Sequence, residues 1–180
     1  MKNKIKVANI DREHLRIIRK SVSDFLKECS NKYDTHGKLL DIAPQDHEGA
    51  NPYFKKANIY TLDIDTESGA DYIADICKNN EDKIPNDYFD LIVCTEVLEH
   101  TLNPFNAVKE IKRILKPGGF IFITVPFNFR IHGPLPDCWR FTEHGLRALF
   151  NNLNIIEMDN IKTPGRDLMP IHYRIILGKE

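Results

Sequence analysis

Between residues 88 and 126 the hydrophobic positions change their period twice, and these changes predict a strand, a helix and a second strand. Leu91–Cys94 is an unbroken apolar run, which is typical of a strand covered on both faces. From Pro104 apolar residues recur at helical spacing until Pro117, Gly118 and Gly119 end the helix, and residues 120–125 are apolar again. We therefore predict a right-handed βαβ unit with a ligand site beyond the carboxyl ends of its strands.

The rest of the pattern predicts an α/β fold, doubly wound around a mostly parallel seven-stranded sheet with an antiparallel closing strand. We expect one domain, residues 1–180, in which residues 1–30 form a helical cover, either of the core or of the entrance to the site, and Asp11 caps the first helix. The predicted helices are 11–29 and 142–151, and the further strands are 38–43, 59–64, 72–76, 155–158 and 172–177.

The segment FDLIVCTEVLEH, followed by EIKRILKPGGFIFITVP, resembles the class I S-adenosylmethionine-dependent methyltransferases, particularly the small bacterial type 11 group. The resemblance runs from about Lys38 to Phe150. It implies a Rossmann-like fold, S-adenosyl-L-methionine as cofactor, and methyl transfer to the oxygen or nitrogen of a small-molecule or saccharide-linked acceptor. A catalytically inactive relative that binds a protein partner is the alternative.

The loop after the first predicted strand departs from that family. The resemblance places Asp41, Ala43 and Gln45 at the cofactor, where the family has a glycine-rich GxGxG turn. The side chains at 43 and 45, and Pro44 without its N–H, would crowd a ligand that normally lies against bare backbone. Gly49 remains available for a tight turn before a following helix.

Asp63 ends the second predicted strand, where a carboxylate can accept hydrogen bonds from both hydroxyls of a ribose. Asp65 is the competing choice, because strand ends read from sequence slip by about two residues. Ile64 is included in the same expected cofactor site.

Four further cofactor residues follow from the resemblance. Asp75 matches the position that meets the adenine amino group, and Ile76 would cover one face of the ring. Thr95 and Glu96 would lie beside the sulfonium, where a carboxylate is electrostatically favourable.

The segment 131–146 should overhang the crevice and supply the acceptor side of the site. We expect His132, Asp137 and Arg140 to orient the acceptor and either His132 or Asp137 to take its proton, with His100 as a further candidate base. The structural alternative is an ion pair between Arg140 and Asp137, with Trp139 packed as a plug.

Composition narrows the function classes. The 180 residues carry a net charge of −1, so nothing in the overall charge favours nucleic acid, and no apolar run reaches the length of a membrane span. The start lacks a signal peptide, and the four scattered cysteines lack metal-site spacing, so we predict a cytoplasmic protein without a metal site. A nicotinamide-dependent oxidoreductase is disfavoured because GxGxxG is missing. The oligomeric state is not indicated.

Overall fold

A computed structural model describes residues 6–44 and 49–180. Its helices and strands follow one another in the order expected of an α/β protein. They are α1 (Asn9–Tyr33), β1 (Lys38–Ile42), β2 (Asn58–Asp63), β3 (Tyr72–Ile73), β4 (Phe89–Thr95), the 3₁₀ turn η1 (Leu98–His100), α2 (Pro104–Ile114), β5 (Leu115–Pro126), α3 (Glu143–Leu149), β6 (Asn154–Thr163) and β7 (Arg166–Gly178). None of the helices in these two ranges is long and apolar enough to cross a membrane.

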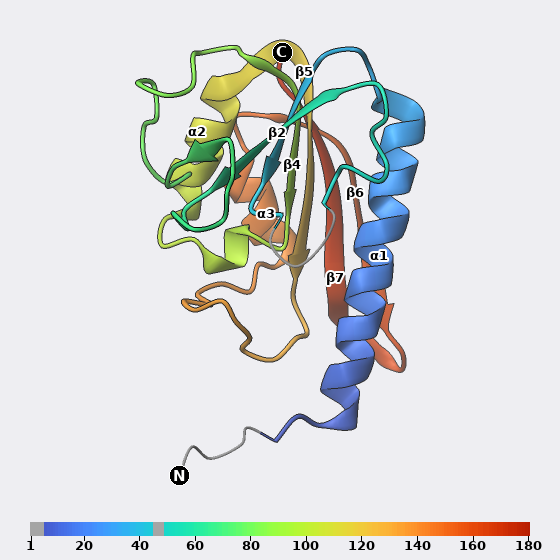
Figure 1. Cartoon of the computed structure of the whole chain (residues 1–180). Helices are drawn as coiled ribbons and strands as arrows, with labels where there is room; N and C mark the ends of the chain where they lie inside the picture. The colour runs from blue at the N-terminus through green and yellow to red at the C-terminus, as the bar shows by residue number, and fades with distance from the viewer. Residues whose placement is uncertain (1–5, 45–48) are drawn as a thin grey trace.

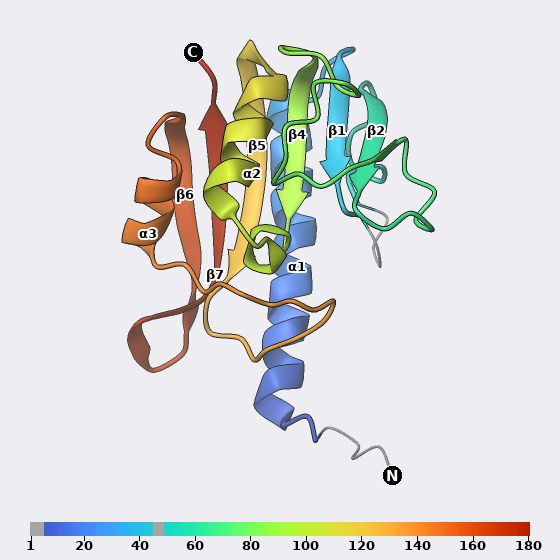
Figure 2. The same ribbon diagram turned by 90° about the vertical axis from the view of Figure 1, so that its left-hand side faces the viewer.

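The seven strands form one sheet in the order β3-β2-β1-β4-β5-β7-β6, with helices on both faces (Figure 1). The pairs from β3 through β5 are parallel, and β7 runs antiparallel to both β5 and β6. In Figure 2 α1 lies behind the sheet, and α2 and α3 lie in front of it. The predicted fold class is therefore confirmed, including the antiparallel closing strand.

The predicted βαβ unit is present as β4, α2 and β5. Asn103 caps α2 through a side-chain oxygen that accepts the Asn106 N–H, and Pro104 occupies the first turn. The apolar face of α2, with Val108, Ile111 and Ile114 buried, packs on one side of the sheet. The strand after it begins at Leu115 rather than at residue 120, because Leu115 already pairs with Phe89.

The first helix begins earlier than the pattern predicts. Asp11 is its third helical residue rather than its N-cap, and its carboxylate accepts the Ala8 N–H at 3.2 Å. Phe25 and Leu26 are buried against Leu39 and Phe122 of the sheet, so α1 covers the face opposite α2 and α3.

Three predicted elements differ in length or kind. The third strand stops at Ile73, because Ala74 donates its N–H to the end of β2 and the chain then turns. Residues 49–53 form turns instead of a helix, because Pro52 interrupts the segment only a few residues before β2 starts at Asn58. The closing strands are longer than predicted and form one hairpin, β6–β7.

Candidate active site

A cavity of about 510 Å³ opens at the carboxyl ends of β1 and β4, where α1 passes the edge of the sheet. Its volume lies within the usual range for small-molecule sites, about 300–1,000 Å³. Its lining comes from α1, from the loops after β1 and β4, and from the loop after β5. The lining residues are Leu15, Ile18, Arg19, Val22, Ser23, Leu26, Ala43, Pro44, Gly49, Pro52, Tyr53, Thr95, Glu96, His100, Phe129, His132, Gly133 and Pro134.

The loop after β1 keeps a glycine-like shape at Ala43 without the glycine. Ala43 has φ of 52°, in the left-handed region, and its methyl group lines the cavity. At Gly49, with φ of 53°, an added Cβ would lie 2.1 Å from an Asp41 carboxylate oxygen, so only glycine fits there. Ala43 and Pro44 border the cavity rather than fill it, and these described residues leave room for the predicted cofactor. Gln45 lies outside the described residues.

Asp41 does not line the cavity, but it holds the loop after β1 through a hydrogen bond to its backbone. Its carboxylate is buried and accepts the Ala50 N–H at 2.6 Å. Burial raises the pKa of Asp41 to about 7, against which the hydrogen bond from Ala50 acts.

The residues predicted to hold the adenosyl group lie at the ends of β2 and β3, outside the cavity lining. Asp63 is buried, and its carboxylate accepts the Asp65 N–H at 2.9 Å. Asp75 accepts the Cys77 N–H at 2.9 Å. Ile64 is exposed, whereas Ile76 packs in the core. Their cofactor roles stay predictions.

Thr95 and Glu96 both line the cavity, and their place beside a sulfonium stays a prediction. Glu96 has φ of 56°, so β4 ends in a strained conformation of the kind that collects at functional sites. Glu96 Oε1 accepts hydrogen bonds from His172 Nε2 at 2.6 Å and from Thr124 Oγ1 at 3.0 Å. Burial would raise the pKa of Glu96, but the charge and hydrogen bond of His172 lower it below its usual value.

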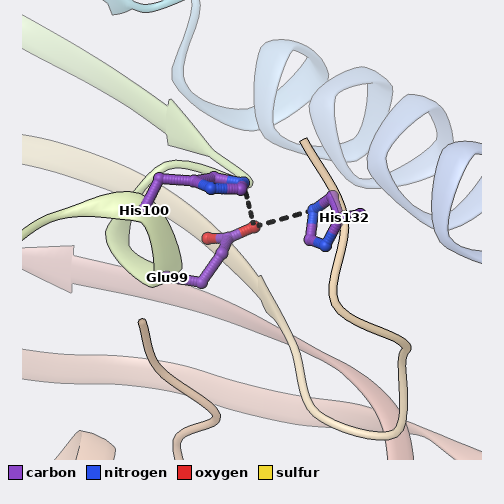
Figure 3. A group of neighbouring side chains, drawn as sticks. All are labelled: Glu99, His100 and His132. Atoms are coloured by element: carbon purple, nitrogen blue, oxygen red, sulfur yellow. Dashed lines mark ion pairs between the residues drawn. The ribbon is translucent and has the colours of Figure 1, made fainter. Parts of the chain in front are cut away.

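One turn further on, Glu99 lies between two histidines (Figure 3). Its Oε1 is 3.7 Å from His100 Nε2 and 3.9 Å from His132 Nε2. The Glu99 side chain is fully buried, and neither carboxylate oxygen has a hydrogen-bond partner among residues 6–44 and 49–180. Burial, together with the charge of Glu96, raises the pKa of Glu99 well above its usual range. Burial also lowers the pKa of His132.

Asp137 fixes the conformation of the loop 131–141 after β5, which we call the acceptor loop after its predicted role. Arg140 donates to both of its carboxylate oxygens, at 2.5 and 2.7 Å, and the His132 N–H donates to it at 2.9 Å. Burial opposes ionisation, but these bonds lower the pKa of Asp137 to about 2, which makes it a weak base. Trp139 donates its indole N–H to Thr101 O and stacks on Phe141. The structure thus contains the Arg140–Asp137 ion pair that was the structural alternative, and a role of Asp137 toward the acceptor stays a prediction.

Sequence reasoning left open whether α1 covers the core or the entrance to the site, and it named none of the α1 residues that line the cavity. Arg19, Val22 and Ser23 line the cavity, and Ser23 Oγ lies 2.7 Å from the Tyr53 hydroxyl oxygen in the loop after β1. The available signal was the apolar stripe of α1, which extends one turn beyond the residues that pack on the sheet. Glu99 was not among the expected site residues, because its burial depends on the distant loop 131–141, where Cys138 and Trp139 donate their N–H groups to Glu99 O.

Comparison with known families agrees with the geometry. A family profile described as "Methyltransferase domain" matches residues 13–158. The ubiquinone biosynthesis O-methyltransferase of Klebsiella pneumoniae is 35% identical over 78 residues, which are 42% of this chain and 30% of that protein. That of Proteus mirabilis is 33% identical over 61 residues, 34% of this chain and 24% of that protein. The chain therefore spans about a quarter to a third of the length of these relatives.

Solved structures share the fold at low sequence identity. A SAM-dependent methyltransferase from Methanosarcina mazei superposes with a TM-score of 0.62 at 17% identity, over 83% of this chain and 95% of that one. The [4+2]-cyclase SpnF superposes with a TM-score of 0.67 at 16% identity, over 88% and 80%. At these identities the likeness concerns the fold alone, and one of the two neighbours is named for a different reaction.

Proposed function

The chain belongs to the methyltransferase domain family, and from that premise we propose that it transfers a methyl group from S-adenosylmethionine to an oxygen or nitrogen of a small-molecule or saccharide-linked acceptor. The observation that carries the proposal is the cavity at the ends of β1 and β4. In that cavity Ala43 keeps a left-handed backbone, and Glu96, His100 and His132 present polar groups. The oxygen acceptors of the O-methyltransferase relatives favour oxygen.

When bound, the cofactor would supply a methyl group on a positively charged sulfur, and the sulfur would keep the electron pair of the carbon–sulfur bond as the acceptor bonds to the methyl carbon. The protein's task is to align the acceptor and exclude water, and alignment alone lowers a barrier by about 7–11 kcal/mol. In this proposal Glu96 supplies negative charge beside the sulfonium. Phe129, in the loop after β5, lines the part of the cavity that would hold the acceptor and excludes water there.

An alcohol acceptor must also lose a proton. Of the three candidate bases predicted from the sequence, His100 and His132 line the cavity, whereas Asp137 does not. The Asp137 carboxylate is already bound by Arg140, so we assign proton removal to the histidine side of the site. Asp137 would position His132, because its carboxylate accepts the backbone N–H of His132.

Isothermal titration calorimetry with S-adenosylhomocysteine tests the proposal. We expect measurable binding to the wild type, and Asp63→Ala should weaken it about 10- to 150-fold, because a charged acceptor of ribose hydroxyls is lost. Asp63→Asn keeps an acceptor for the Asp65 amide and separates loss of charge from loss of the turn. Asp65→Ala tests the competing assignment.

The outcomes separate two functions. Unchanged affinity in Asp63→Ala, with the variant folded by circular dichroism, contradicts this placement of the cofactor. Absence of heat with the wild type at millimolar cofactor contradicts methyl transfer and favours the non-catalytic alternative. That alternative has support in the loss of the glycine-rich turn between Ala43 and Gly49.

A further inference from the structure

Glu99 is an exception among the buried acids of the described chain. Asp41, Asp63 and Asp137 are buried too, but each accepts at least one backbone N–H or an arginine. Glu99 accepts nothing at either carboxylate oxygen within residues 6–44 and 49–180. A carboxylate buried without a partner costs several kcal/mol, either as an unpaired charge or as a group forced to keep its proton, and a bound cation would remove that cost.

The two histidines beside Glu99 are held in a fixed orientation. His100 Nδ1 lies 2.9 Å from Pro136 O, and His132 Nδ1 lies 3.1 Å from an Asp137 carboxylate oxygen. Both partners only accept hydrogen bonds, so each Nδ1 carries a proton and each Nε2 keeps a lone pair. Both Nε2 atoms face Glu99 Oε1, and Figure 3 marks the two contacts. Outer partners of this kind orient the ligands of metal sites.

We propose that Glu99, His100 and His132 bind a divalent first-row transition-metal ion. The donor atoms lie within 4.8 Å of one another, and the two Glu99–histidine distances are 3.7 and 3.9 Å. Ligands about 2.0–2.1 Å from a tetrahedral ion are separated by about 3.4 Å, so small side-chain rotations close the site. Two imidazoles favour zinc, iron or cobalt over magnesium or calcium.

An ion pair between Glu99 and protonated histidines is the competing explanation. Both separations exceed hydrogen-bond length, so such a pair would leave the carboxylate oxygens unbonded in a buried position. A metal ion bonds these three donors at once, and it explains why Asp137 and Pro136 orient the far side of both rings.

The position of the site suggests what the ion does, and this part rests on the proposed function. His100 and His132 line the same cavity as Glu96, so positions of the ion not taken by protein face the acceptor. A hydroxyl bound there loses its proton more readily, and the proton leaves to solvent through the open cavity. With both Nε2 atoms used as ligands, the ion replaces the histidines in activating the acceptor. The acceptor class is therefore an alcohol or phenol.

Metal titration of the chelator-stripped protein tests the site without cofactor or acceptor. We expect Co²⁺ to bind at a 1:1 ratio, with visible d–d absorption, and Zn²⁺ to compete for the same site in calorimetry. His132→Ala should weaken binding more than about 100-fold, and Asp137→Asn, which alters an outer partner, about 10- to 100-fold. His36→Ala, an exposed histidine beyond the amino end of β1, is the matched control and should bind as the wild type does.

Glu99→Gln separates the metal site from the ion pair. Glutamine keeps the size of the side chain but cannot become a negatively charged ligand, so it should weaken metal binding more than about 100-fold and leave the melting temperature of the metal-free protein close to that of the wild type. A lower melting temperature with unchanged metal affinity would overturn the proposal, as would absence of Co²⁺ binding to the wild type. Metal binding without binding of S-adenosylhomocysteine would support the site and contradict the proposed function, so the two failures are distinguishable.

Discussion

The two halves of the strand-end rim use their acidic residues in opposite ways. At the ends of β1, β2 and β3, the carboxylates of Asp41, Asp63 and Asp75 each accept a nearby backbone N–H and shape their own turns. After β4 and β5, Glu99 is buried without a hydrogen bond, and Asp137 is held by an arginine on the same loop. The first half uses its carboxylates to hold backbone, whereas the second leaves the Glu99 carboxylate without a hydrogen bond beside two histidines that line the cavity.

This difference indicates where chemistry is located. A carboxylate satisfied by its own turn contributes shape, and its removal disturbs folding or ligand position. A buried carboxylate without hydrogen bonds points to reactivity or ion binding, because no contact within the fold offsets the free energy of its desolvation.

Removal of the Arg140 side chain should give the largest effect. Arg140→Ala leaves the fully buried Asp137 without its charged partner and should lower the free energy of unfolding by about 3–5 kcal/mol in urea denaturation. Arg147→Ala is the matched control, because it breaks an exposed pair with Glu143, and it should cost less than about 1 kcal/mol. Equal costs in the two variants would show that the acceptor loop does not depend on the buried pair.

The second-largest effect on stability should come from Asp41→Asn, which removes a buried carboxyl group at the end of β1. Its pKa is raised from 3.8 to about 7, so the folded state holds a proton that the unfolded state has lost. The resulting stability is full below about pH 4 and is lost as pH rises through 7. Asp41→Asn should therefore match the wild type near pH 4 and exceed it at pH 8 by about 2–4 kcal/mol.

Chemical denaturation across pH 4 to 8 measures this effect, and Asp24→Asn on the exposed face of α1 serves as control. A variant that is less stable than the wild type at pH 8 would contradict the raised pKa of Asp41. Asp41 would then resemble Asp137, a buried carboxylate that the protein stabilises in its ionised form.

Restoring a glycine at Ala43 should give the smallest effect. The left-handed backbone costs a non-glycine residue about 1–2 kcal/mol, and glycine adds about 0.5–1 kcal/mol of chain entropy. Ala43→Gly should therefore stabilise the protein by about 0.5 kcal/mol and tighten cofactor binding, as measured by thermal denaturation and calorimetry. Ala148→Gly, on the exposed face of α3, should instead destabilise it by about 1 kcal/mol. Destabilisation by both changes would show that Ala43 is unstrained.

The sequence by itself determined the βαβ unit, the class of the sheet and, to within about one residue, the ends of β1, β2 and β4, but not the end of β3. These features follow from hydrophobic period, caps and breakers, which act over a few residues, as Leu91–Cys94 and the Asn103 cap illustrate. The same local signals fail where pairing partners decide an element, so the length of the β6–β7 hairpin and the start of β5 were not predictable.

Only the tertiary structure decided which polar groups meet. Glu99 and His132 come from different loops, and His172 reaches Glu96 from the closing strand. Their separations depend on how the loop 131–141 and β7 pack, because burial and unused hydrogen-bond capacity are properties of the assembled core rather than of any segment. The sequence therefore identified the edge of the sheet that carries the site, and the packing of distant loops set its chemistry.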